Sequence, residues 1–215
     1  MLCYLVDRYS RCFYILNLIN ICGGGCFCHN LNYTHILKGN IVCIYPHHTL
    51  NLKTGWNLIS IPLQPANTSL WHALAQIQGK FDKVFTYTQD GGWSYKAHYA
   101  GNWYGDLDKI EPSKGYWVYM KEAANLTING YAPDKNISLD SGWNLIGWPS
   151  NETTQVIEAL ASINNSYDKV FTYDQNGGWE YMAYYDGTWY GYLDVMKPGK
   201  GYWIYMEEAG SLQVP

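Results

Sequence analysis

The chain has 215 residues and a net charge of −4; 15% of its residues are charged and 17% are aromatic. This balance argues against a nucleic-acid-binding protein, which usually carries a basic patch or stripe, and against a disordered chain, which lacks aromatic residues. Ten tryptophans and 21 tyrosines indicate a small, aromatic-rich and largely β-sheet core. The length allows one or two domains.

Residues 1–49 differ in chemistry from the rest of the chain, and we expect them to form a leader or poorly structured segment. All six cysteines lie in the first 43 residues, whereas all ten tryptophans lie in 56–203. Residues 12–28 carry no charge and follow Arg8 and Arg11, a pattern typical of a secretory signal. This run is shorter than the ~20 apolar residues that span a bilayer, so membrane contact is expected only through this segment.

The same segment leaves two other interpretations open. A start codon assigned too early would also produce a leader without structure of its own. A zinc site is the other interpretation, although the spacing C-x3-C-x-C-H does not match paired C-x2-C knuckles. Its ligands would be Cys22, Cys26, Cys28, His29 and His35. We expect no metal site and no cofactor in this chain.

The rest of the chain contains one pattern written twice. Positions 81–122 and 167–208 are identical at 27 of 42 aligned residues, which is a strong indication of duplication. We therefore expect a first repeat unit over residues 50–130 and a second over residues 137–215. The turn-rich stretch 129–136 joins them.

Each unit begins with a strand and a short helix. Residues 55–62 alternate weakly in polarity and stop at Pro62, which cannot donate to a β ladder, so they predict a strand and its exit. Residues 70–77 have apolar side chains at helical spacing and predict one amphipathic helix. This stripe is Leu70, Ala73, Leu74 and Ile77, and it returns as Val156, Ala159, Leu160 and Ile163. Gly79 and its counterpart Asn165 suit a left-handed helix cap.

A β-hairpin follows the helix. Its arms, 84–87 and 93–99, flank Asp90 and Gly91, a pair suited to a turn that needs positive φ. Alternate residues of the second arm are unchanged in the copy, whereas the residues between them differ. Because side chains alternate between the two faces of a strand, the unchanged set predicts the core-facing side. That set is Trp93, Tyr95, Ala97 and Tyr99, which return as Trp179, Tyr181, Ala183 and Tyr185.

The last predicted strand is Tyr116–Met120, after a turn that begins at Pro112 and ends at Gly115. Trp117 and Tyr119 are unchanged in the copy, where they are Trp203 and Tyr205. One such ring buries ~150–250 Å² and a small unit buries little surface overall, so we expect these rings to build the core. The elements predict an α+β fold, mainly antiparallel β, with two tandem homologous repeats that each contain a small sheet and one short helix.

The motif GWNLI…P, a short helix, DKV and P-x-K-G-Y-W-[VI]-Y-M resembles a tandem repeat of secreted and cell-surface proteins of archaea and bacteria, found in surface-layer-like and adhesin-like chains. The resemblance covers nearly all of 50–215. It implies a structural or adhesive extracellular module whose partners are envelope or surface-layer proteins and glycans, without a specific ligand. The matching residues are Gly55–Ile59, Pro62, 82–84, Pro112 and 115–117, and their copies 142–146, Pro149, 168–170, Pro198 and 201–203.

The duplication also bears on catalysis, because a site made within one unit should survive in both. No histidine is duplicated and neither unit contains a cysteine, so we expect no acyl-transfer triad and no zinc hydrolase. Three acids are duplicated and could form a carboxylate pair for glycoside hydrolysis or ligands for calcium. They are Asp82, Asp108 and Glu122, with copies Asp168, Asp194 and Glu208. We expect structural roles for them, and no catalytic residue.

Carbohydrate binding is the main alternative to a structural module. Exposed aromatic rings can stack on the faces of pyranose sugars, and four tryptophans lie near turns with tyrosines close by. They are Trp93, Trp103, Trp179 and Trp189. The sequence favours the structural interpretation, in which these rings cover a small core. Exposed rings in a groove would instead favour sugar binding.

Sequons of the form N-x-[ST] are frequent and are typical of exposed loops in exported proteins, although polar turns rich in Asn, Ser and Thr also produce them. They occur at Asn32 and at the glycosylation candidates Asn67, Asn125, Asn136, Asn151 and Asn164. We therefore expect a non-catalytic structural or adhesive repeat module of an extracellular or cell-surface protein. A carbohydrate-binding module is the first alternative and a glycoside hydrolase is the second.

Overall fold

The computed structural model describes part of the N-terminal segment and nearly all of the rest of the chain. The described residues are 3–6, 12–15, 36–37, 40–41 and 46–215. The chain divides into two compact units, Met1–Pro46 and His47–Pro215. In the first, β1 (Cys3–Val6) pairs antiparallel with β2 (Cys12–Ile15), and β3 (Ile36–Leu37) with β4 (Asn40–Ile41). The proposed zinc ligands, Asn32 and residues 16–28 of the predicted signal lie outside the described residues.

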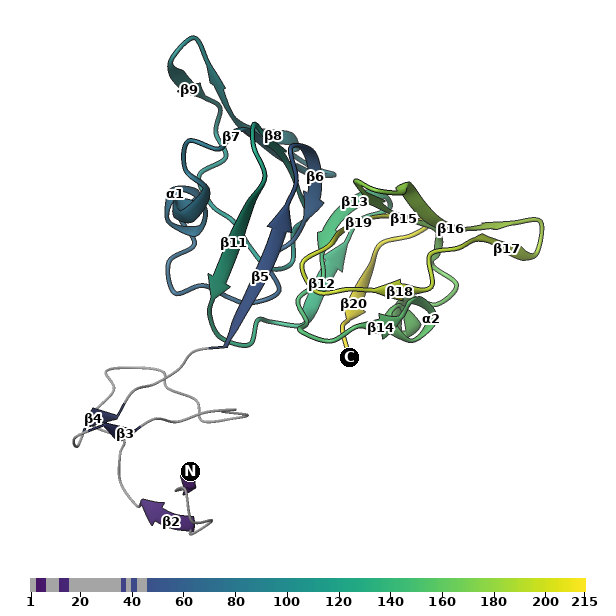
Figure 1. The fold of residues 1–215 in the computed structure, drawn as a ribbon. Coiled ribbons are helices and arrows are strands. Elements are labelled where there is room, and N and C mark those ends of the chain that lie inside the picture. The colour runs from purple at the N-terminus through teal and green to yellow at the C-terminus, as the bar shows by residue number, and fades with distance from the viewer. Residues whose placement is uncertain (1–2, 7–11, 16–35, 38–39, 42–45) are drawn as a thin grey trace. The chain divides into compact units, whose positions relative to one another are not determined.

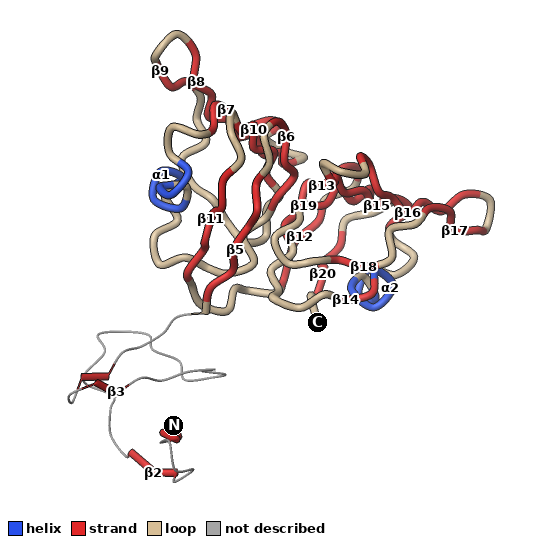
Figure 2. Tube along the Cα trace, in the orientation of Figure 1, coloured by secondary structure: helices blue, strands red, loops and turns tan. Residues whose placement is uncertain are grey.

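The second unit contains two five-stranded antiparallel sheets (Figure 1). The first sheet has the order β6 (Gly55–Ile59), β10 (Tyr116–Met120), β7 (Phe81–Thr88), β8 (Gly92–Tyr99) and β9 (Asn102–Tyr104). The second has the order β13 (Gly142–Gly147), β19 (Gly201–Met206), β15 (Tyr167–Asp174), β16 (Gly178–Tyr185) and β17 (Thr188–Gly191). The prediction of a mainly antiparallel β structure is therefore confirmed, and Figure 2 shows how little of this unit is helical.

A smaller layer covers one face of each sheet. It contains the pairs β5 (His47–Leu52) with β11 (Ala124–Asn129), β12 (Asn136–Leu139) with β20 (Gly210–Gln213), and β14 (Thr154–Gln155) with β18 (Val195–Met196). The predicted single helix is divided into α1 (Leu70–Ala73) and the 3-10 turn η1 (Ala75–Ile77), and its counterpart into α2 (Val156–Ala159) and η2 (Ala161–Ile163). Gly79 and Asn165 have the predicted positive φ, +82° and +68°.

The hydrophobic cores lie between the sheets and these covering layers and are mostly aliphatic. On β10 the buried side chains are Tyr116, Val118 and Met120, whereas Trp117 and Tyr119 lie half-buried on the opposite face. The prediction that Trp117 and Tyr119 build the core is therefore wrong. Of the ten tryptophans, all within the described residues, only Trp148 is fully buried.

The face of β8 that is unchanged between the copies is also the exposed one. Trp93 is 52% exposed and Tyr99 is 76% exposed, so the core assignment of this set is wrong. The register explains the result, because fully buried Val84 pairs with Lys96, which places Tyr95 with Phe85 on the other face. The hairpin turn also differs from the prediction. Thr88 pairs with Gly92, so the residue with positive φ is Gly92 (+69°).

The halves that carry the two sheets, residues 47–130 and 137–215, meet through reciprocal backbone contacts. The Ser60 N–H donates to the Gly199 carbonyl at 2.9 Å, and at matching positions the Gly147 N–H donates to the Ser113 carbonyl at 2.9 Å. Reciprocal contacts of this kind are those of a two-fold interface. The buried Ser60 hydroxyl is one of the contacts that break the symmetry: it donates to the Lys200 carbonyl at 2.8 Å and accepts from the Trp148 N–H at 3.1 Å.

We call this contact region between the two halves the joint. The glycine of the repeated G-Y-W segment permits the close approach of the halves there. A Cβ on Gly115 would lie 2.7 Å from the Ile146 carbonyl oxygen, and a Cβ on Gly201 would lie 2.8 Å from that of Ile59. Each glycine therefore lies against the opposite half. The repeated motif therefore has two structural roles: its glycine contacts the other half, and its aromatic residues begin the strand that follows.

Candidate binding groove

The face of each sheet opposite the core is covered with aromatic side chains. On the first sheet, the centroid of Trp56 lies 6.2 Å from that of Trp117 and 5.8 Å from that of Phe85. On the second sheet, the equivalent Trp143 lies 6.2 Å from Trp203 and 5.8 Å from Phe171. The pairing register places these residues on one face because side chains alternate along each strand.

The joint brings the two aromatic faces together. Trp117 of the first half lies 5.4 Å from Tyr173 and 5.7 Å from Trp179 of the second, measured between ring centroids. Reciprocally, Trp203 lies 5.4 Å from Tyr87 and 5.8 Å from Trp93. These rings form one continuous surface, here called the aromatic groove. It consists of Trp56, Phe85, Tyr87, Trp93, Trp117, Trp143, Phe171, Tyr173, Trp179 and Trp203.

The groove contains two adjoining hollows. The first, of about 540 Å³, is lined by Trp56, Phe85, Trp93, Trp117, Tyr173 and Trp179. The second, of about 730 Å³, is lined by Tyr87, Trp93, Trp143, Phe171, Trp179 and Trp203. The two linings are equivalent: each residue that lines the first hollow has its counterpart from the other half in the second hollow. The residue types match at every position, and both sets consist only of aromatic residues.

The indoles of the groove are solvent-accessible. Trp93 is 52% exposed and Trp179 is 46% exposed, and both line the two hollows. Trp56 and Trp143 are 38% and 36% exposed. The ring contacts of Trp56 and Trp143 are with rings of their own sheets, so these two can be changed without removing a ring contact across the joint.

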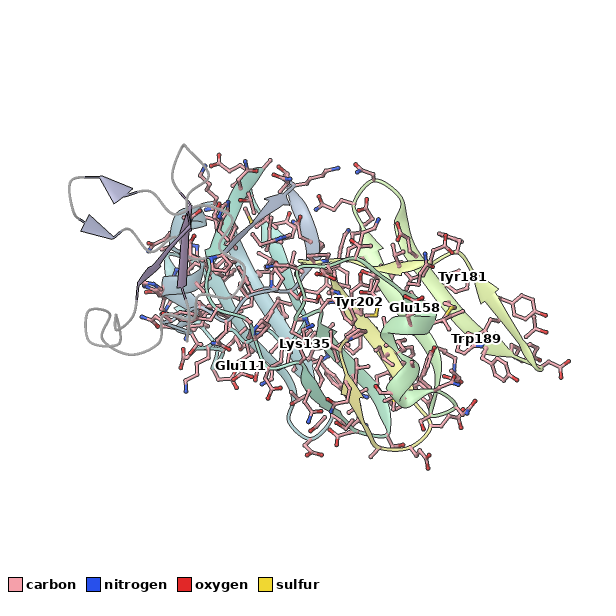
Figure 3. The ribbon with its side chains drawn as sticks, turned by 90° about the horizontal axis from the view of Figure 1, so that it is seen from below. Glu111, Lys135, Glu158, Tyr181, Trp189 and Tyr202 are labelled. Carbon is pink, nitrogen blue, oxygen red and sulfur yellow. The ribbon has the colours of Figure 1, made fainter. Side chains whose placement is uncertain are left out.

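The four tryptophans predicted as sugar ligands occupy two different environments. Trp93 and Trp179 lie in the groove. Trp103 is half-buried against Phe81 and Trp71, at 5.3 and 4.9 Å. Trp189 lies on the β16–β17 arm (Figure 3), 5.3 Å from Tyr167 and 5.2 Å from Tyr184.

Sequence reasoning missed the other eight groove residues as candidate ligands. Six of them were not considered, and Trp117 and Trp203 were assigned to the core. One signal could have found all eight, since aromatic identity is unchanged between the halves at every groove position. Whether such a set of unchanged aromatic residues faces the core or the solvent can be seen only in the three-dimensional structure.

Four of the six duplicated acids, Asp82, Asp108, Glu122 and Asp168, lie in separate ion pairs. Asp82 is 3.6 Å from His98 Nδ1 and 3.5 Å from Lys121 Nζ. Asp108 is 2.8 Å from Lys96 Nζ. Glu122 pairs with Lys80 at 3.3 Å, and Asp168 with Lys169 at 2.8 Å. Among the described residues, no group of three His, Cys, Asp or Glu side chains is placed to hold a metal ion.

A third hollow, of about 240 Å³, has a mixed polar and apolar lining and follows β5 along the joint. Its two lysines are engaged within the protein, Lys53 with the Asn176 side chain and Lys200 with Asp174 at 2.7 Å. Hydrogen bonds from Lys200 and from the Asn176 N–H hold the pKa of Asp174 at about 2, below its ordinary value of 3.8. This hollow is therefore part of the structural contact between the halves.

The depressed pKa of Asp174 predicts a loss of stability in acid. Because the folded-state pKa lies below the unfolded value, the pair stabilises the fold fully above pH ~4 and progressively less as the pH falls toward 2. The pair is about one-third exposed, so its effect should stay within about 1 kcal/mol. Urea unfolding of the wild type and of Asp174→Asn should differ at pH 5.5, and this difference should become smaller at pH 2.5. A difference that is unchanged between these pH values would contradict the assignment.

All five glycosylation candidates are exposed: Asn67, Asn125, Asn136, Asn151 and Asn164. Asn125 lies on β11 and Asn136 begins β12, so these two belong to strands, whereas sequons usually mark loops. The Asn67 side chain accepts a hydrogen bond from the Ser69 N–H at 2.9 Å, just before α1.

Comparison of the chain with known protein families, with curated proteins and with solved structures finds no match to any of them. Within the described part of the chain, none of the helices has the length and apolar character needed to cross a membrane.

Proposed function

We propose that residues 47–215 are a non-catalytic, adhesive module of an extracellular or cell-surface protein that binds carbohydrate through the aromatic groove. Two tandem homologous units would form it, over residues 50–130 and 137–215. The identity of all five groove pairs, at positions that are half-buried or exposed, carries this proposal. Trp71 offers the contrast: it is 36% exposed, as is Trp143, but its counterpart outside the groove is Ile157. Exposed aromatic residues are therefore not kept everywhere in the two halves.

The chemistry of the groove favours a carbohydrate ligand. Indole faces pack against the C–H faces of pyranose rings, burying apolar surface while the hydroxyl groups stay in water. No charged side chain lines either hollow, so the groove favours a neutral ligand. The five exposed sequons support export and glycosylation of the same chain, with envelope proteins and glycans as its partners.

A purely structural module is the second candidate. The contacts of Trp117 with Tyr173 and Trp179 favour it, because rings that hold the halves together would also remain unchanged. Trp56 and Trp143 distinguish the two functions. A structural role across the joint does not require them, whereas a ligand lying along the groove would contact both.

Replacing Trp56 and Trp143 tests the proposal. Glycan-array screening should identify neutral glycans bound by the wild type, and the double variant Trp56→Ala/Trp143→Ala should lose this binding. Each single variant should weaken it about tenfold, since a nucleic-acid base stacked on an aromatic side chain contributes about 1–3 kcal/mol and a sugar ring should contribute toward the lower end of that range. Trp71→Ala is the matched control, with equal exposure outside the groove, and should bind as the wild type does.

Two outcomes would contradict carbohydrate binding. The first is a folded wild-type protein that binds no glycan of a broad array. The second is a wild-type dimer, detected by light scattering, that dissociates when Trp56 and Trp143 are replaced, because a second copy would then cover the groove. Far-UV circular dichroism of each variant verifies that the fold is intact.

A further inference from the structure

The two hollows of the groove form a single track of indoles, in which neighbouring rings meet edge to face at interplanar angles of 88°, 69°, 87° and 67°. In one direction Trp56, Trp117 and Trp179 follow one another at centroid distances of 6.2 and 5.7 Å. In the other, Trp143, Trp203 and Trp93 follow at 6.2 and 5.8 Å. Because Trp93 and Trp179 line both hollows, the two runs adjoin. A ligand in one hollow therefore touches rings that also belong to the other.

Each hollow provides aromatic rings and no charged or amide side chain. Such a subsite offers stacking, while specificity for individual hydroxyl groups usually comes from placed polar groups. A single sugar ring would consequently bind weakly. Affinity can still accumulate when linked sugar rings contact several indoles at once, because the second contact becomes intramolecular.

The symmetry of the groove limits the ligand further. A polysaccharide chain has a direction, and a two-fold arrangement presents the two hollows to it in opposite directions. Hydrogen-bonding sites would distinguish those directions. Stacking does not, provided that both faces of each sugar ring are flat and apolar, as they are in pyranoses whose substituents are all equatorial.

We infer that the groove binds one extended, neutral polysaccharide of β-linked, equatorially substituted pyranose units, which spans both hollows from Trp56 to Trp143. This inference rests on the proposed carbohydrate binding and adds the ligand class and the mode of binding. Beside the groove, Lys83 lies over Tyr119 at 5.5 Å and Lys169 over Tyr205 at 4.5 Å. These pairs flank Trp56 and Trp143, which contact the same tyrosines at 5.1 and 5.2 Å.

Calorimetric titration with cello- and chito-oligosaccharides of two to six units tests the inference. The wild type should bind the six-unit chains at least about tenfold more tightly than the two-unit chains, with one chain per protein. Trp56→Ala and Trp143→Ala should each remove this dependence on length, so that six units bind no more tightly than two units bind the wild type. Trp71→Ala and Trp189→Ala should retain it.

The possible failures are distinguishable. Two six-unit chains per protein, or equal affinity for two and six units, would show independent subsites and overturn the spanning mode. Binding restricted to compact α-linked glycans on the array would overturn the ligand class while leaving carbohydrate binding intact. No glycan binding at all would refute the proposed function itself. If Trp56→Ala is unstable, Trp56→Phe, which retains a smaller ring, should keep part of the length dependence.

Discussion

Gly147→Ala is expected to lower the free energy of unfolding by about 2–3 kcal/mol, because position 147 lies where the two halves meet. A Cβ there would lie well inside the van der Waals contact distance from the Pro112 carbonyl oxygen, 2.7 Å from the Lys114 carbonyl oxygen and 2.9 Å from the Ser60 Cβ. Ser60 occupies the matching position in the first half, so the joint accommodates one side chain and not two.

Thermal unfolding measures this effect, with an expected fall of about 5–10 °C in the midpoint. Gly177→Ala is the control, since a Cβ at that turn position meets no atom within 4 Å, and it should change the midpoint little. Near-UV circular dichroism should weaken for Gly147→Ala, because the rings of the groove are brought together by the same joint. An unchanged midpoint together with an unchanged near-UV spectrum would refute the role of Gly147.

Trp148→Ala is expected to destabilise the protein by about 3–5 kcal/mol, the range for removing a large side chain from a core. Trp148 is fully buried in the second core, and its Nε1–H donates to the Glu152 carbonyl at 3.0 Å. The variant would lose apolar burial, leave a cavity and remove the partner of that carbonyl.

Urea denaturation of Trp148→Ala should show a lower midpoint with an unchanged slope. Trp148→Phe should lose about half as much stability as Trp148→Ala, because the phenyl ring fills much of the cavity but does not restore the hydrogen bond. Trp71→Ala removes an exposed indole and should cost much less. An equal loss of stability in Trp148→Ala and Trp71→Ala would contradict the prediction that the buried tryptophan contributes more to stability than the exposed one.

Local patterns predicted part of the elements: β6, β7, β8, β10 and the helical segment were expected, whereas β5, β9 and β11 were not. The strand Tyr116–Met120 has the predicted bounds, and the residues with positive φ beyond the helices are Gly79 and Asn165, as expected. Turn chemistry, strand alternation and helical spacing are properties of neighbouring residues, so they can be read along the chain. The prediction of the helix was less accurate. The segment is α-helical only over Leu70–Ala73 and continues as the 3-10 turn Ala75–Ile77, in which Ile77 is buried.

The candidate site could be predicted only in part. Trp93 and Trp179 were named as ligands, whereas Trp56 and Trp143 were not, because they lie 37 and 36 residues away in sequence. Pairing through β10 and β19 brings these residues to one face. The alternation of β8 identified two faces correctly, but the face that is unchanged between the copies was assigned to the core. Unchanged identity cannot distinguish packing in a core from contact with a ligand.

The sequence by itself determined the strands β6, β7, β8 and β10 with their counterparts, a short helical segment and the sequons, because each depends on residues close together in the chain; the repetition of the pattern can also be read directly from it. Tertiary structure alone decided which face of each sheet is buried. The pairs β5–β11 and β12–β20, formed by residues at opposite ends of each half, cover one face and leave the aromatic one open. The joint then merged two open faces into one groove, since backbone contacts between Ser60, Gly147 and the opposite half cannot be read from either half alone.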